Sequence, residues 1–220
     1  MPTTTTFEIK VANIPESLIP EFENKSCHAS TMFNKDPLTA TWFRENLVMP
    51  IEWTLEHPHD VPPNASNKFE DQLQSFARFG YKAWNIENRQ HATSYIKVTS
   101  MADNSCISIA GRADYLITRE SVTVADYLSR ILCVIEIQSK HGNRSTELCE
   151  LQMQVYLLIL MNTKNLPAVA GFLVMDNGQC RAFKSTRDES GGCLFEMNDA
   201  FHVGYIAEVM DTVVRSLGLR

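Results

Sequence analysis

The segment of residues 131–138 constrains the fold most, because it is apolar on both faces of an extended chain until Glu136. Such a strand is typical of a central position in a sheet that is covered on each side. The segment of residues 148–161 is apolar nearly all round a helix, which predicts a buried helix. Ser145 or Thr146 stands before this helix as an N-cap. A buried strand followed by a buried helix argues against a bundle and against a β-sandwich.

The remaining periodic segments predict further elements around this pair. Helical spacing of apolar residues predicts one helix from Ser66 to Gly80 and a last helix over residues 203–217. Besides residues 131–138, alternation predicts strands at residues 95–98, 106–117, 168–175 and 179–184, the last two joined by the turn Asp176-Asn177-Gly178. We therefore expect an α/β fold with a central mixed five-stranded sheet flanked by helices.

Residues 1–62 differ from the rest of the chain. Prolines punctuate this segment, so long helices are not expected there, although residues 7–11 alternate like a short strand. Trp42, Phe43 and Trp53 indicate that it packs on the body. We expect residues 1–62 to form an N-terminal arm and residues 63–220 the main domain. The arm gates a substrate, forms a homodimer or only completes the core; the sequence leaves these three roles open.

Composition narrows the setting of the chain. Its 220 residues suit one domain with a sizeable core. No apolar run approaches the roughly 20 residues that span a bilayer, and the polar N-terminus lacks the pattern of a signal peptide. We expect an intracellular protein, in the cytoplasm or nucleus, with no membrane association and with six buried free thiols. The net charge of −6 argues mildly against a non-specific nucleic-acid binder.

Two acidic residues, Asp114 and Glu136, follow apolar stretches of neighbouring predicted strands. Two carboxylates buried close together are costly unless a cation compensates them, and Mg²⁺ or Mn²⁺ prefers such oxygen ligands. The two-residue period of a strand places Gln138 and Lys140 on the face of Glu136. An acid, an amide and an ammonium on one face suit the chemistry of a phosphate. The alternative is that both acids mark solvent-exposed strand ends with ordinary salt bridges.

Three short motifs stand in a fixed order along residues 66–184. They are Gly111-Arg112-Ala113-Asp114, then Glu136-Ile137-Gln138, then Gln152 and Tyr156 four residues apart on the buried helix. This order resembles the PD-(D/E)XK nucleases and, among them, the RecB-like branch with its G-x-x-D, E-x-K and Q-x-x-x-Y motifs. The resemblance implies a restriction-endonuclease-like core. Gln138 departs from the pattern, because the family has lysine there.

The resemblance also implies a role for each residue. Asp114, Glu136 and the main-chain carbonyl of Ile137 would ligate Mg²⁺ or Mn²⁺, with Glu70 of the first helix acting through water or on a second ion. The residues implied to position the attacking water are Gln138 and Lys140, and those implied to contact nucleic acid are Gln152, Tyr156 and Arg112.

Each of these supporting residues also has an ordinary structural explanation. Glu70 is equally well a solvated acid, and Tyr156 a core aromatic with Gln152 beside it. Arg112 and Lys140 are equally well cations of solvated loops. The sequence thus predicts a metal-dependent nuclease, with DNA favoured over RNA because the resemblance favours it. The alternative is a catalytically inactive nuclease-fold module that binds nucleic acid or protein.

Overall fold

A computed structural model provides the structure of the chain. It describes residues 6–10, 51–55, 61, 65–86, 94–99, 106–111, 113–138, 145–164, 166–187, 189 and 193–219. For residues 6–10, 94–99, 106–111 and 162–163 it describes the backbone alone. Of the predicted N-terminal arm it therefore describes residues 6–10, 51–55 and 61.

The described residues form strands, three α-helices and short 3₁₀ turns. The strands are β1 (Thr6–Lys10), β2 (Ile51–Glu52), β3 (Tyr81–Asn85), β4 (Ser94–Thr99), β5 (Cys106–Gly111), β6 (Tyr115–Arg119), β7 (Cys133–Ile137), β8 (Ala168–Val174), β9 (Gln179–Arg187), β10 (Cys193–Met197) and β11 (Phe201–His202). The α-helices are α3 (Leu73–Ala77), α4 (Thr146–Lys164) and α5 (Ile206–Ser216). The 3₁₀ turns are η2 (Phe69–Gln72), η3 (Tyr127–Ser129) and η5 (Val203–Tyr205).

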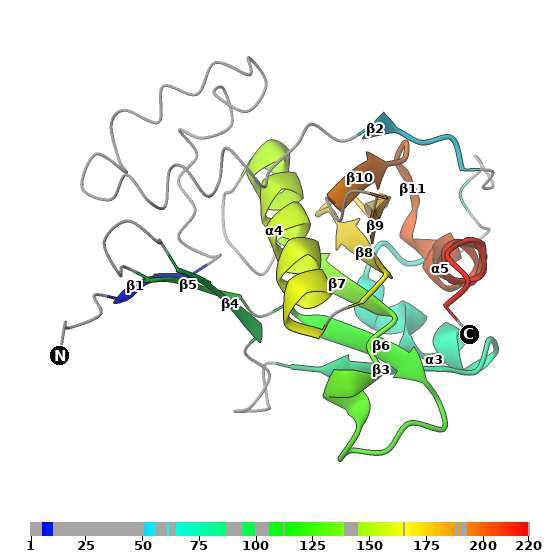
Figure 1. The fold of residues 1–220 in the computed structure, drawn as a ribbon. Helices are drawn as coiled ribbons and strands as arrows, with labels where there is room; N and C mark the ends of the chain where they lie inside the picture. The colour runs from blue at the N-terminus through cyan, green and yellow to red at the C-terminus, as the bar shows by residue number, and fades with distance from the viewer. Residues whose placement is uncertain are drawn as a thin grey trace, which may run out of the picture.

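The main sheet is open and mixed (Figure 1). Its strands run in the order β2-β10-β9-β8-β7-β6-β3, and β11 pairs with β9. The pairs β7–β8 and β2–β10 are parallel and the others antiparallel. The α/β class is thus confirmed, whereas the prediction of a five-stranded sheet is wrong, because the sheet has eight strands.

The predicted and observed strands of the main sheet differ because two predicted segments lie elsewhere and other strands were not predicted. β4 and β5 leave the main sheet and pair with β1 in a separate three-stranded sheet. β5 ends at Gly111 and β6 begins at Tyr115, after a bend at Asp114, so residues 106–117 are two strands and not one. The strand next to β6 is β3, which the sequence analysis missed because it directly follows a helix and carries polar residues at two of its five positions.

The main sheet is covered on both faces, as the apolar pattern of residues 131–138 predicted. On β7, Cys133, Ile135 and Ile137 pack with α5, while Val134 belongs to the core beneath α4. All five residues of β7 are buried. Figure 1 shows α4 and α5 on opposite sides of the sheet.

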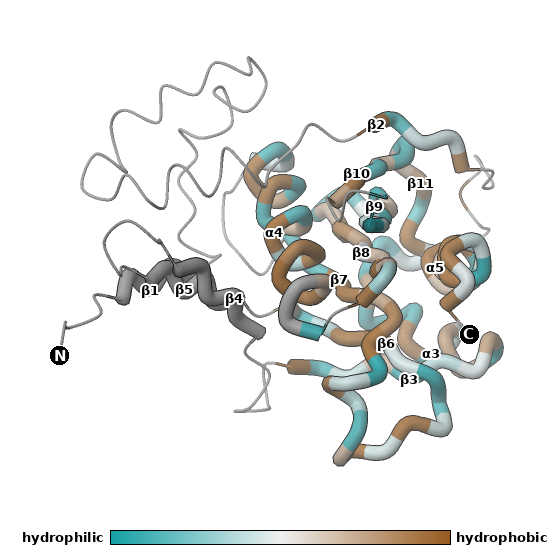
Figure 2. The backbone as a smooth tube through the Cα atoms, in the orientation of Figure 1, coloured by the Kyte–Doolittle hydropathy of each residue, from teal (hydrophilic) through white to brown (hydrophobic). Residues whose placement is uncertain are grey.

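Helix α4 is apolar nearly all round because it is enclosed. One side packs on β8, β9 and β7, and it also contacts β4 and β5 of the small sheet. Ser145 accepts a hydrogen bond from the Leu148 N–H at 3.2 Å, which confirms it as the N-terminal cap. By contrast, α5 covers one face alone and carries both hydrophobic and hydrophilic residues around its turns (Figure 2).

The hairpin β8–β9 turns where the sequence predicted it. Gly178 has a φ of +80°, a left-handed conformation that glycine adopts without strain. The side chain of Asn177 accepts a hydrogen bond from the Gln179 N–H at 3.0 Å, as turn asparagines commonly do. The hairpin fixes the register of β9 against β8 and hence of every residue that β9 contributes to the sheet.

The end of the predicted arm joins the main sheet. β2 pairs with β10, and the N–H of Trp53 donates to the Met197 carbonyl at 2.8 Å. The ammonium of Lys184 lies 4.2 Å from the centre of the Trp53 ring. Residues 51–55 therefore help to complete the main domain, whereas the roles of the arm in gating and in forming a homodimer stay predictions.

At Gly171, side chains of α4 pack directly against the backbone of β8. A Cβ atom there would lie well inside van der Waals contact with the Met153 sulfur and 3.1 Å from Leu157 Cδ2. We expect Gly171→Ala to destabilise the protein by about 1–3 kcal/mol through this overpacking. In open space the same change is stabilising by about 0.4–1 kcal/mol, since it restricts the unfolded chain.

Urea denaturation of Gly171→Ala, Met153→Ala and the double variant measures this contact. The double variant should lose less stability than the sum of the two single variants, because truncating Met153 makes room for the new methyl group. Additive losses, or a stabilised Gly171→Ala, would show that α4 is not seated on Gly171 as described.

Candidate metal site

Asp114 and Glu136 lie beside each other on neighbouring strands. β6 and β7 pair Tyr115 with Ile135 in antiparallel register, so the next step places Asp114 opposite Glu136. The Ile137 N–H donates to Asp114 Oδ2 at 2.7 Å, which ties the carboxylate of Asp114 to the strand that carries Glu136. Directly opposed residues of antiparallel strands have Cβ atoms about 4.5–5.5 Å apart. The structure thus brings the predicted pair together.

Both carboxylates belong to the face that α4 covers. The row that contains them continues to Ile86, the residue directly after β3, whose N–H donates to the Asp114 carbonyl, and to Leu173 on β8. Both of these residues pack in the core beneath α4. Asp114 is 4% exposed and Glu136 is 1% exposed. Like charges directly opposite on one face are destabilising, and burial increases the cost. A divalent cation between the two carboxylates would offset that cost.

The strand ends earlier than predicted. β7 stops at Ile137, and half-buried Gln138 has a 3₁₀ conformation instead of an extended one. The reason is local: β6 begins only at Tyr115, and the Asp114 side chain takes the N–H of Ile137 in place of a further strand partner. The prediction that Gln138 continues the strand face of Glu136 is therefore wrong. Lys140, the third residue of that predicted face, lies outside the described residues.

Gln152 and Tyr156 are both buried on α4, at 0% and 6% exposure. Successive helix residues are about 100° apart, so a residue's neighbours on the sheet follow from those of its helix neighbours. Glu150 contacts β9, and Met153 and Leu157 contact β8. Going round the helix from the β9 side to the β8 side, the next residues are Tyr156 and Gln152. These two side chains therefore lie on the β7 side of α4. This is the side of α4 that faces Asp114 and Glu136.

Glu70 is exposed on η2, and its neighbour Phe69 packs on the Tyr115 ring at 4.9 Å. Tyr115 belongs to the core on the α5 side of the sheet, so η2 lies on the face opposite to the two carboxylates. Within the described ranges, no group of three or more His, Cys, Asp or Glu side chains comes together to hold a metal ion. The structure thus does not group Glu70 with the two buried acids, and its role on a metal stays a prediction.

Of the two remaining predicted residues, Ile137 is described by the structure and Arg112 is not. Ile137 has its side chain buried on the α5 side, and its main chain lies at the end of β7 beside the Asp114 carboxylate. Its carbonyl is thus on the correct strand end for the predicted role as a ligand. Arg112, predicted to contact nucleic acid, lies outside the described residues.

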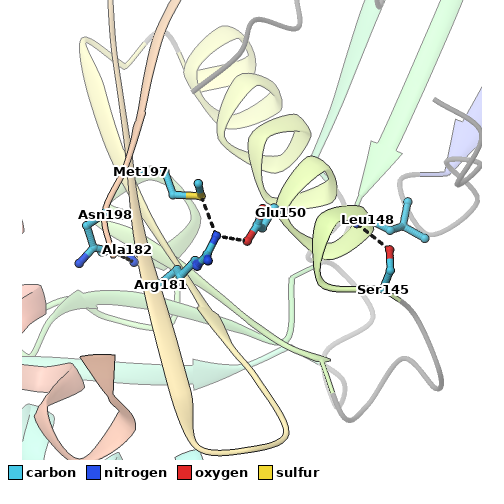
Figure 3. A network of polar contacts seen from close by, with 7 residues as sticks. All are labelled: Ser145, Leu148, Glu150, Arg181, Ala182, Met197 and Asn198. Atoms are coloured by element: carbon cyan, nitrogen blue, oxygen red, sulfur yellow. Dashed lines mark hydrogen bonds and ion pairs between the residues drawn. The ribbon is translucent and has the colours of Figure 1, made fainter. Parts of the chain in front are cut away.

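Arg181 and Glu150 form an ion pair that was not predicted from the sequence. Arg181 Nη1 donates to Glu150 Oε1 at 2.5 Å and contacts the Met197 sulfur at 3.6 Å (Figure 3). Burial raises the pKa of Glu150, and the Arg181 guanidinium lowers it in part. No sequence signal identifies this pair, because the register of β9 against β8 and the seat of α4 bring it together.

A separate cavity of about 510 Å³ lies at the other end of β6 and β7. Its lining includes Arg119, Arg130 and Leu132. Leu132 is four residues from Glu136, about 13 Å along an extended chain. The cavity is therefore not part of the candidate metal site.

Comparisons with known protein families and with curated sequences identified no relative of this chain. No protein-family model matches this chain, and no curated protein sequence matches it. Within the part of the chain that the structure describes, no helix combines the length and the hydropathy needed to cross a membrane. The functional proposal accordingly rests on the residues themselves and on their arrangement.

Proposed function

We propose that this chain is a metal-dependent nuclease that hydrolyses phosphodiester bonds of nucleic acid, DNA in preference to RNA. One observation carries the proposal: Asp114, directly before β6, and Glu136 on β7 are both buried, and the Asp114 carboxylate is hydrogen-bonded to the residue after Glu136. The cation implied is Mg²⁺ or Mn²⁺, held by the two carboxylates and by the main-chain carbonyl of Ile137.

The order of the elements supports the proposal. Three antiparallel strands of the main sheet (β3, β6 and β7) precede the buried helix α4, with β4 and β5 of the separate sheet inserted between β3 and β6, and the hairpin β8–β9 follows it. This is the context of strands, helix and hairpin that the resemblance to PD-(D/E)XK nucleases implies. The two acids fall at the end of β7 and the start of β6, and Gln152 and Tyr156 fall on α4, as the motifs of that family require.

The residues have separable tasks in such a site. A bound cation would supply a nucleophilic water at neutral pH and would neutralise charge that develops on the phosphate. The Ile137 N–H fixes the orientation of the Asp114 carboxylate, which keeps a ligand in place before the metal arrives. The position at the carboxyl ends of the parallel strands β7 and β8 is where open α/β sheets commonly bind ligands.

An inactive module that binds nucleic acid or protein is the second candidate. Gln138 favours it, because a glutamine at the position of the family lysine orients water or phosphate but lends no positive charge. In this case the acids would hold a cation, or shape the fold, without hydrolysis.

One experiment separates these candidates. The purified protein is incubated with supercoiled plasmid, single-stranded DNA and single-stranded RNA in Mn²⁺, in Mg²⁺ or in EDTA, and binding to the same nucleic acids is measured alongside. We expect cleavage with Mn²⁺ and none with EDTA, with DNA cut faster than RNA. Binding without cleavage would support the inactive module, and the absence of both would contradict any role on nucleic acid.

A further inference from the structure

The row of the sheet that carries the two acids ends on a cation. Register pairs Glu136 with Leu173 on β8, and Leu173 with Arg181 on β9, so the three residues share one face at one level. Neighbouring strands are about 4.8 Å apart, which places the Cα atoms of Glu136 and Arg181 about 10 Å apart. Arg181 thus stands two strands away from the candidate metal site, on the same side of the sheet.

Other described cations on this face lie far from the row. Lys82 on β3 is four residues before Ile86, and Arg187 is six residues from Arg181 along β9. These separations correspond to about 13 Å and 20 Å of extended chain. Arg187 is also engaged at that end, where it donates to the Met161 carbonyl at 3.0 Å. Arg181 is therefore the described basic side chain best placed to meet a substrate that reaches the two acids.

The Arg181 side chain is both held and accessible. Nη1 makes the contacts with Glu150 and Met197, and the side chain remains 32% exposed. A guanidinium presents five N–H groups in a planar fork that fits the oxygens of a phosphate. Within this fork, Nε is buried and has no hydrogen-bond partner among the described residues, so the Glu150 ion pair at Nη1 does not use all of the donors.

We propose that Arg181 binds a backbone phosphate of the nucleic-acid substrate next to the scissile one, while Glu150 holds the guanidinium in position. This inference rests on the proposed function. The N-terminal half of α4 packs over β8, between Arg181 and the two acids, so Arg181 meets a neighbouring phosphate and not the one under attack. It supplies positive charge at the site despite the neutral Gln138.

Three variants test the inference: Arg181→Met, Arg181→Lys and Glu150→Gln, with Arg78→Met as the matched control at an exposed arginine. Each is measured for the Kd of a single-stranded DNA oligonucleotide at several salt concentrations, for KM and kcat of cleavage with Mn²⁺, and for Tm. We expect Arg181→Met to raise Kd and KM about tenfold and to reduce the salt slope of binding by about one, with kcat nearly unchanged. Arg181→Lys should restore part of the binding, because an ammonium keeps the positive charge but lacks the planar fork.

Glu150→Gln tests the positioning role. Without the carboxylate the guanidinium loses its charged partner, so Kd should rise, although less than in Arg181→Met, and Tm should stay close to that of the natural sequence. If both variants weaken binding in step with a loss of Tm, the pair only ties α4 to β9 and the inference is overturned. Cleavage by Arg181→Met with unchanged KM and salt slope also overturns it and leaves the nuclease proposal standing. If the natural sequence binds DNA through Arg181 without cutting it, the inference holds and the nuclease proposal fails.

Discussion

Glu136→Gln is expected to lower Mn²⁺-dependent cleavage by about 10²–10³-fold, the loss typical of removing one group that stabilises the transition state. The amide has the size of the carboxylate but no charge, so it is a far weaker ligand for a hard cation. Without metal, the same change removes one of two buried like charges that stand opposite each other. The metal-free variant should therefore be at least as stable as the natural sequence.

The measurement pairs a cleavage time course in Mn²⁺ with a Tm in EDTA. Glu208→Gln is the control, because Glu208 is exposed on α5, on the other side of the sheet. Full cleavage by Glu136→Gln would contradict the role of this residue. A large drop of its Tm in EDTA would instead show that Glu136 serves the fold as a charged group.

Two substitutions of Asp114 are expected to separate its effect on stability from its effect on metal binding. Asp114→Ala deletes the acceptor of the buried Ile137 N–H, which should cost about 1–3 kcal/mol of stability without metal. Asp114→Asn keeps an oxygen in that place, so its metal-free stability should stay close to that of the natural sequence. Both should lose cleavage to a similar extent as Glu136→Gln, because both lack the charged ligand.

Thermal unfolding with and without Mn²⁺ distinguishes the two effects. At about one hundred times Kd, a bound cation stabilises a protein by about 2.7 kcal/mol, and this increment should appear in the natural sequence alone. An equal increment in Asp114→Asn would mean that the cation binds elsewhere. A metal-free Asp114→Asn as unstable as Asp114→Ala would show that the carboxylate charge itself supports the bend.

The elements that the sequence predicted correctly are those with strong local patterns. The strand β7, the helix α4 with its cap at Ser145 and the hairpin at Gly178 each follow from periodicity or turn chemistry within a short segment. The approach of Asp114 to Glu136 was predicted as well, because the start of one strand lies beside the end of the next when two consecutive strands pair in antiparallel fashion.

The rest depended on pairing between distant segments. Nothing within residues 94–99 and 106–111 distinguishes a strand of the main sheet from one of a separate sheet, since that choice is made by pairing with β1. β10 was missed for a similar reason, because its partners are β9 and the distant β2. Arg181 was not predicted for the same reason, because its position two strands from Glu136 depends on the register of β7 and β9 against β8.

In the candidate site, too, the features that were predicted wrongly depend on contacts between distant segments. The end of β7 at Ile137 removed Gln138 from the strand face of Glu136, a change caused by the side chain of Asp114 that a two-residue period does not contain. Glu70 was predicted from its position on the first helix, yet the packing of Phe69 on Tyr115 turns that helix to the other face. A metal site on the two buried acids is therefore better supported than one on three.

Isothermal calorimetry of Mn²⁺ binding tests the central claim most directly, since it requires neither a substrate nor catalysis. Mn²⁺ is titrated into the natural sequence, Asp114→Asn, Glu136→Gln and the control Glu208→Gln. The arrangement of Asp114 and Glu136 predicts one Mn²⁺ site in the natural sequence and in the control, and its loss in each of the two site variants. Binding that persists unchanged in either Asp114→Asn or Glu136→Gln would contradict a cation shared by these two carboxylates.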